Sequence, residues 1–204
     1  MNYNEQYYIA EQPPGDDQIY LKPDKRTANR GYHYKQLPQG DNPLFFMNGY
    51  REKDNNRWPI PHILMDGGDL IVIDDIRNEL KKYDIDGMQL YPAVYIDDHD
   101  KWHENYWFLN FYQELDCWDR ERSIYHRDID VDPDSYAEVD KYYLDEKILD
   151  PIPEERRLMF RVGDTSMGHI FIHQKIVDFI IKNKFTGVRF FKVSDFKEGD
   201  QYRP

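Results

Sequence analysis

Two histidines and four carboxylates are crowded into one short stretch of the chain, residues 97–104, which reads DDHDKWHE. Imidazole nitrogens and carboxylate oxygens are the groups that bind divalent metal ions. His99 and His103 would share one face only in a helix. The apolar runs on both sides of the stretch predict strands instead, which makes it a hairpin loop. A metal site, a solvated loop and a loop that contacts a partner remain the alternatives, and the spacing argues against the metal.

A second acidic run places an aspartate at every other position: Asp128, Asp130, Asp132 and Asp134. This spacing is similar to the start of a calcium-binding loop, but Pro133 stands where that loop needs glycine and Val139 where it needs its bidentate glutamate. In an extended strand the four carboxylates would project to one side and repel one another unless a cation or a basic partner relieved them. The run therefore predicts a surface for a cationic protein.

A third candidate lies at 115–125, LDCWDRERSIY, where Asp116 and Asp119 stand near Ser123. Two carboxylates at this spacing could act as general acid and base, as in a glycosidase. The simpler interpretation is a turn or helix cap closed by ion pairs with Arg120 and Arg122. Sequences of the types GxSxG, GxxxxGK[ST], GxGxxG and HExxH are absent, so the common enzyme classes lose support. GDTSMG at 163–168 is interpreted as a turn.

The elements that must position these residues include two similar units. A strand at 67–73, a helix at 74–83 and a strand at 88–96 are predicted by the hydrophobic pattern. The same pattern returns one hundred residues later, with each unit placing a glycine, Gly87 or Gly187, just before its second strand, where a left-handed turn favours glycine. The paired positions are Leu70, Ile76, Leu80, Ile85, Leu90 and Tyr91 with Ile170, Ile176, Ile180, Phe185, Phe190 and Phe191.

The rest of the chain completes an α+β prediction. Residues 105–113 and 157–162 predict further strands, while residues 1–60, rich in Pro, Gly, Asn and Tyr, predict a loop-rich N-terminal region packed on a domain at 61–204. The expected fold is a mixed sheet with two strand–helix–strand units. The stretch 114–156 is long for a connection, and long connections within compact domains are often functional.

Charge narrows the possible partners. The chain carries a formal net charge of −12, and residues 66–155 hold nine Lys and Arg against twenty-six Asp and Glu. Such a surface repels nucleic acid and acidic membranes and steers a basic protein toward it. A solvated surface that maintains solubility is the alternative. The single cysteine, Cys117, excludes an intramolecular disulfide. No membrane span or signal peptide is recognisable, so we expect a cytoplasmic protein without cofactor.

Three stretches follow one another between roughly residues 60 and 192: GDLIVIDDIRNELKKYDIDGMQLYPAVYI, NYWFLNFYQELDCWDRERSIY, and LMFRV followed by HIFIHQKIVDFIIKNKFTGVRFF. Within them are Tyr91 with Pro92, a D-x-x-D-x-x-x-S pattern from Asp116 to Ser123, and Phe160 with Arg161. In this order they resemble the bacterial immunity proteins of polymorphic toxin systems. The resemblance implies a cytoplasmic antidote that binds and neutralises a toxin encoded beside it, with no catalytic residues.

The leading hypothesis is therefore an immunity protein that grips a basic toxin through its acidic connections. A small hydrolase or metal-dependent enzyme that uses the acidic clusters is the alternative, and an adaptor without a toxin is a third. Aromatic side chains beside the acidic runs would supply most of the binding energy. The predicted contact residues are Asp97, Asp98, Asp100, Trp102, Glu104, Tyr125, Asp128, Asp130, Asp132, Asp134 and Tyr136.

Overall fold

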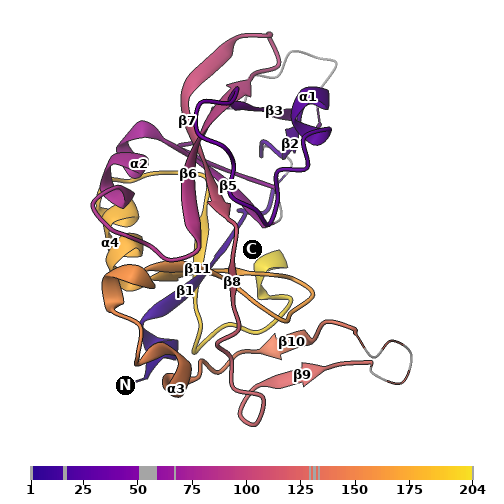
Figure 1. Cartoon of the computed structure of the whole chain (residues 1–204), viewed down its shortest axis with the longest axis vertical. Helices are drawn as coiled ribbons and strands as arrows, with labels where there is room; N and C mark the ends of the chain where they lie inside the picture. The colour runs from indigo at the N-terminus through magenta and orange to yellow at the C-terminus, as the bar shows by residue number, and fades with distance from the viewer. Residues whose placement is uncertain are drawn as a thin grey trace.

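The computed structural model describes residues 2–15, 18–50, 59–66, 68–128, 130, 132 and 134–203. Two mixed sheets, one two-stranded antiparallel sheet and a few short helices make up this part of the chain, so the α+β prediction is confirmed (Figure 1). The helices are η1 Tyr3–Glu5, α1 Lys25–Ala28, α2 Asp74–Leu80, α3 Glu146–Leu149, η2 Glu154–Arg156, α4 Gln174–Lys182 and η3 Asp200–Tyr202. The strands are β1 Tyr7–Glu11, β2 Leu21–Pro23, β3 Leu44–Asn48, β4 Ile63–Asp66, β5 Asp69–Ile73, β6 Met88–Ile96, β7 Trp102–Phe111, β8 Glu114–Leu115, β9 Ile124–His126, β10 Glu138–Lys141, β11 Met159–Val162, β12 Ile170–His173 and β13 Arg189–Lys192.

The two sheets repeat one arrangement. One has the strand order β2-β3-β6-β7-β5-β4, and the other β13-β1-β12-β11-β8. In the first, β7 lies antiparallel between β5 and β6, which α2 connects. In the second, β1 lies antiparallel between β12 and β13, which α4 connects. Each strand–helix–strand segment therefore has its two strands separated by a third.

The N-terminal region supplies strands to both sheets. β1 is an interior strand of the second sheet, between β13 and β12, whereas β2 and β3 extend the first, β3 by parallel pairing with β6. These residues are therefore integral to the sheets. Between their short strands they form loops, as the content of Pro, Gly, Asn and Tyr suggested. The division of the chain at residue 60 stays a prediction.

Strand alternation divides the apolar side chains among three cores, because successive residues of a strand point to opposite faces. Ile170 and Ile172 enter a central core that both sheets share with α2 and α4, while Phe171 between them enters a second core. On β5, Leu70 and Val72 likewise enter the central core. Ile71 enters a third core, beneath the N-terminal strands. Each sheet is thus covered on both faces.

The helices meet the central core through their predicted apolar positions. Ile76 and Leu80 of α2 and Ile176 and Ile180 of α4 are all at most 4% exposed and belong to this core. The helix predicted for 74–83 is shorter, because Lys81 caps it and Tyr83 N donates to Leu80 O in a following turn. α2 and α4 lie one above the other at the left of Figure 1.

Both glycines that precede the second strand of a unit have a left-handed backbone, with φ of 67° at Gly87 and 103° at Gly187. This prediction is confirmed. At Gly187 a side chain is also excluded by space, since a Cβ there would lie 1.9 Å from the carbonyl oxygen of Ile63. Ile63 N also donates a hydrogen bond to Thr186 O at 3.0 Å. The loop before β13 therefore lies directly against β4 of the other sheet.

We predict that Ile176→Asp unfolds the protein or lowers its free energy of unfolding by roughly 4 kcal/mol or more, because the substitution places an unpaired carboxylate in the shared core. Ile181→Asp is the matched control on the same helix, since Ile181 is 61% exposed, and we expect it to change stability by only about 0.5–1 kcal/mol. Urea denaturation followed by circular dichroism measures both. Equal stabilities of the two variants would contradict the assignment of the core.

Candidate functional site

Residues 124–141, here called the acidic arm, form a two-stranded antiparallel ribbon that projects from the body (Figure 1). Tyr125 of β9 pairs with Val139 of β10. Val139 and Ala137 face the second core, whereas all three residues of β9 are exposed. The arm is therefore fixed to the body through Ala137 and Val139, whereas β9 is open to solvent.

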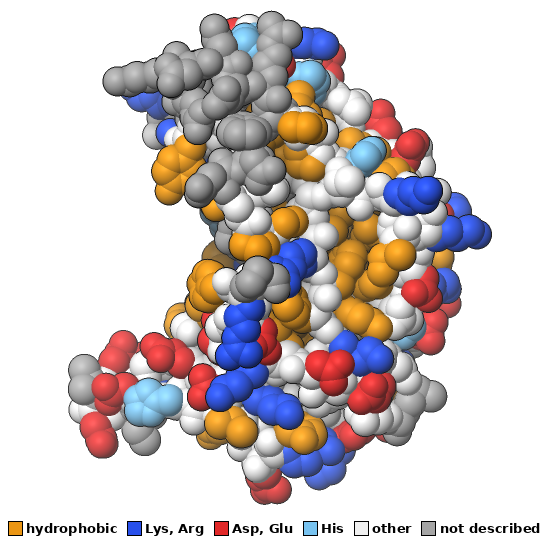
Figure 2. Space-filling model, turned by 180° about the vertical axis from the view of Figure 1, so that it is seen from behind, with side chains coloured by type: hydrophobic (Ala, Val, Ile, Leu, Met, Phe, Trp, Pro, Cys, Tyr) orange, Lys and Arg blue, Asp and Glu red, His pale blue; other side chains and the backbone are white. Residues whose placement is uncertain are grey.

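The tip of the arm carries the acidic run, and all four of its aspartates are exposed. Figure 2 shows acidic side chains gathered on this projection. The run does not form an extended strand, because Asp132 N donates to Asp128 O at 3.0 Å and Ser135 N donates to Asp132 O at 3.0 Å. The aspartates thus lie in the connecting turn of the ribbon. The Asp132 carboxylate stabilises this turn by accepting from Asp134 N.

A charged anchor holds the root of the arm. The Asp164 carboxylate pairs with Arg120 at 2.8 Å and also with Arg127, which directly follows β9. Burial opposes ionisation, but the hydrogen bonds and charges of the two arginines outweigh it and lower the pKa of Asp164. Ser166 N also donates to Ala137 O at 2.9 Å. The predicted turn at 163–168 therefore serves as the support on which the arm rests.

Aromatic rings lie close to the acidic tip. Tyr125 packs edge-on against the buried Trp118, with ring centroids 4.9 Å apart, and remains 39% exposed. Tyr136 is 61% exposed. Trp118 itself is held by its indole N–H, which donates to Gly163 O at 3.1 Å. The arm therefore exposes two tyrosines close in sequence to the aspartates.

The other predicted acidic loop is the turn of the β6–β7 hairpin, as the sequence indicated. Asp97 accepts hydrogen bonds from His99 N and Lys101 N and contacts the His103 ring nitrogen at 2.9 Å. Burial opposes ionisation of Asp97, but these hydrogen bonds prevail and lower its pKa. Asp98 accepts from the amide of Asn48 at 3.1 Å. The Asp97 carboxylate therefore shapes the turn, and Asp98 connects the loop to the end of β3.

The two acidic loops lie at opposite ends of the molecule (Figure 1). Trp102, the first residue of β7, is 49% exposed at the hairpin end, and its ring lies 5.4 Å from that of Phe45. Arg26 lies over Phe45 at 3.9 Å. Glu104 is exposed on the same strand. The structure therefore separates the predicted contact residues into two groups, and it adds Arg26 and Phe45 to the second.

The clusters considered for catalysis are occupied by ion pairs. Asp116 pairs with Arg120 at 2.5 Å and Asp119 with Arg122 at 2.7 Å. The hydrogen bond from Arg122 is the main cause that lowers the pKa of Asp119, opposite to the shift that a general acid needs. Within the described residues no group of three His, Cys, Asp or Glu side chains is placed to hold a metal ion.

Two other sequence features are placed by the structure. Cys117 is fully buried in the second core, and burial raises the pKa of its thiol. The described part of the chain holds no helix with the length and apolar character that crossing a membrane requires.

A buried histidine lies beneath the root of the arm, and no local sequence pattern pointed to it. His169 is 5% exposed and is contacted by Glu11 at 2.9 Å and by Glu198 at 3.3 Å. Glu198 N donates to Asp140 O of β10, so the network joins the C-terminal segment to the arm. The three residues are distant in sequence and meet only in the folded chain.

A comparison with protein-family models matches residues 5–195 to a family described as "Immunity protein family (Imm11)". The match includes the acidic arm, both strand–helix–strand segments and nearly all of the N-terminal region. It therefore extends beyond the residues that carried the resemblance in the sequence. No curated protein matches the chain.

We predict that His169 and His173 titrate on opposite sides of the ordinary histidine pKa of about 6.5. Burial lowers the pKa of both, but at His169 the hydrogen bonds and charges of Glu11 and Glu198 outweigh burial and raise it. The stabilisation from charged His169 is therefore full below about pH 6.5 and is lost as the pH rises through its higher folded-state pKa. NMR titration of the two imidazoles measures both midpoints, with His173 as internal control. A midpoint for His169 below that of His173 would contradict the network.

Proposed function

The chain belongs to the Imm11 immunity protein family, and we propose that it protects the cytoplasm of its host by binding a cognate toxin and blocking it in a stoichiometric complex. Such inhibition needs a complementary surface and no catalytic group. The observation that supports a contact surface most directly is the acidic arm, a ribbon that projects from the body with its charged tip and all of β9 exposed.

Three of the four aspartates at the tip of the arm have no evident role in folding. Asp128, Asp130 and Asp134 form no ion pair in the described part of the chain, whereas Asp164 at the root is paired twice. Like charges crowded on a turn repel one another, but opposite a basic surface they accelerate association and disfavour wrong partners. We therefore propose a toxin with a basic surface, contacted by the tip of the arm.

The tyrosines beside the tip suit the same role. Interfaces draw most of their energy from a few rings that become buried on binding, while the surrounding charges set the rate of encounter. Tyr136 is exposed and Tyr125 is already held against Trp118, so ordering it on binding requires little additional loss of freedom. In this proposal, Tyr125 and Tyr136 would contribute to the lifetime of the complex and the aspartates to its rate of formation.

The proposed function predicts that this chain copurifies in a fixed ratio with the product of the neighbouring gene and protects cells that express it. Tandem affinity purification followed by mass measurement of the intact complex gives the ratio, and growth during co-expression gives the protection. Ile176→Asp serves as the unfolded control in the same cells. A neighbouring gene product that neither binds the chain nor harms cells would contradict the proposal.

For the arm, we predict that changing its four tip aspartates together to Asn slows association roughly tenfold at low salt and weakens the salt dependence of the rate. Stability should stay the same or rise slightly, because repulsion within the tip is relieved. The substitutions are Asp128→Asn, Asp130→Asn, Asp132→Asn and Asp134→Asn.

A matched control removes the same number of negative charges from exposed sites elsewhere: Asp75→Asn, Asp84→Asn, Glu154→Gln and Glu155→Gln. If net charge alone governs encounter, both quadruple variants will associate at the same reduced rate, and the assignment to the arm is wrong. Surface plasmon resonance at several salt concentrations distinguishes the two cases.

A further inference from the structure

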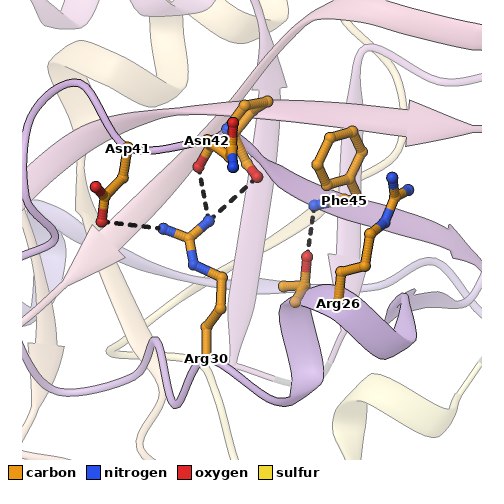
Figure 3. A pocket seen from close by; sticks show the side chains of 7 residues that line it. Arg26, Arg30, Asp41, Asn42 and Phe45 are labelled. Carbon is orange, nitrogen blue, oxygen red and sulfur yellow. Dashed lines mark hydrogen bonds and ion pairs between the residues drawn. The ribbon is translucent and has the colours of Figure 1, made fainter.

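A pocket of about 300 Å³ opens beside α1, at the end of the molecule opposite the arm (Figure 3). Its walls come from α1 and its following turn and from the segment that leads into β3. They carry two guanidinium groups, those of Arg26 and Arg30, and a phenyl ring, Phe45. Trp102, one of the predicted contact residues, packs against the same ring.

The two arginines differ in how many of their guanidinium N–H groups already have a hydrogen-bond acceptor. Arg30 donates through Nη1 to Asn42 O at 2.6 Å and Pro43 O at 3.2 Å, and through Nη2 to the Tyr91 hydroxyl at 3.2 Å. Asp41 lies 3.7 Å from the same Nη2. Figure 3 shows this guanidinium enclosed by its contacts. Arg30 therefore stabilises the wall of the pocket through these hydrogen bonds.

Arg26 is held in place but keeps its outer edge free. Its Nε donates to the buried Asp24 carboxylate at 2.6 Å, and its guanidinium lies over Phe45 at 3.9 Å. Asp24 is itself fixed, because its other oxygen caps α1 by accepting from Thr27 N at 2.9 Å. In the described residues, Nη1 and Nη2 of Arg26 have no hydrogen-bond partner, and the side chain is 55% exposed.

A guanidinium that is held in place with two unused N–H groups can bind a planar anion. Two parallel N–H groups match the two oxygens of a carboxylate, and such charge-assisted bidentate bonds are among the stronger polar contacts. Because Asp24 and Phe45 already restrict the side chain, less freedom is lost when the ligand binds. Arginine and tryptophan are also among the residues that most often dominate binding energy at protein interfaces.

We propose that Arg26, supported by Phe45 and Trp102, receives an Asp or Glu side chain of the toxin, so that the complex has a second contact of opposite polarity to the acidic arm. This inference rests on the proposed function. It assigns the partner a carboxylate facing the α1 end and a basic surface facing the arm. The two contacts differ kinetically, because exposed charges act mainly on association and a bidentate pair acts mainly on dissociation.

The test measures the binding kinetics of the full-length chain with the copurified toxin. Arg26→Ala should accelerate dissociation roughly tenfold or more with little change in the association rate. Arg26→Lys should recover only part of this loss, because it keeps the charge but not the planar fork. Arg77→Ala is the matched control, since Arg77 also lies over a surface ring, Trp107 at 3.8 Å, but on α2. It should dissociate like the wild type.

A double-mutant cycle then identifies the ligand. Each acidic residue on the toxin surface is changed to its amide and combined with Arg26→Ala, and one of them should lose its effect in that background. Absence of any coupled carboxylate, or dissociation of Arg26→Ala at the wild-type rate, would overturn the inference and leave the proposed function standing. Failure of the wild-type chain to bind the toxin would overturn both.

Discussion

The apolar core between the two sheets is the interaction on which the other features depend. Ile76 and Leu80 of α2 and Ile176 and Ile180 of α4 share it, so neither strand–helix–strand segment buries its helix without the other. Where the halves meet, Gly187 lies so close to Ile63 that no side chain fits between them. Because interiors are close-packed and transmit strain, this contact makes one body of two similar halves. The arm and the hairpin can therefore project from a rigid support.

The two ends of that support are stabilised by different means. The arm has little core of its own beyond the root of β10, and the Asp164 ion pairs with Arg120 and Arg127 hold it in place. At the α1 end, a capped helical turn, an enclosed Arg30 and the ring of Phe45 position Arg26. An acidic, solvated end suits rapid encounter, and a preorganised cationic end suits a long-lived contact. In the proposed complex, the toxin contacts both the acidic end and the cationic end.

Several elements could be read from local patterns. The two strand–helix–strand segments, the glycines with left-handed backbone and the β6–β7 hairpin depend on hydrophobic period and turn chemistry, which neighbouring residues determine. The alternating pattern from Asp128 to Asp134 did not by itself decide between an extended strand and a turn. Alternating aspartates suit a strand only if one side has something to face, and here hydrogen bonds between Asp128, Asp132 and Ser135 close a turn instead.

Composition and hydrophobic pattern were enough to predict the fold class, the acidic character of the middle of the chain and the segments that carry the charge. Folding of the whole chain places β1 inside a sheet next to β12, roughly one hundred and sixty residues further along the chain, and places the two acidic loops at opposite ends. It also brought His169 between Glu11 and Glu198, and Arg26 against Phe45. Local periodicity does not contain this information, because strand pairing and side-chain packing between distant segments depend on the shapes of both partners.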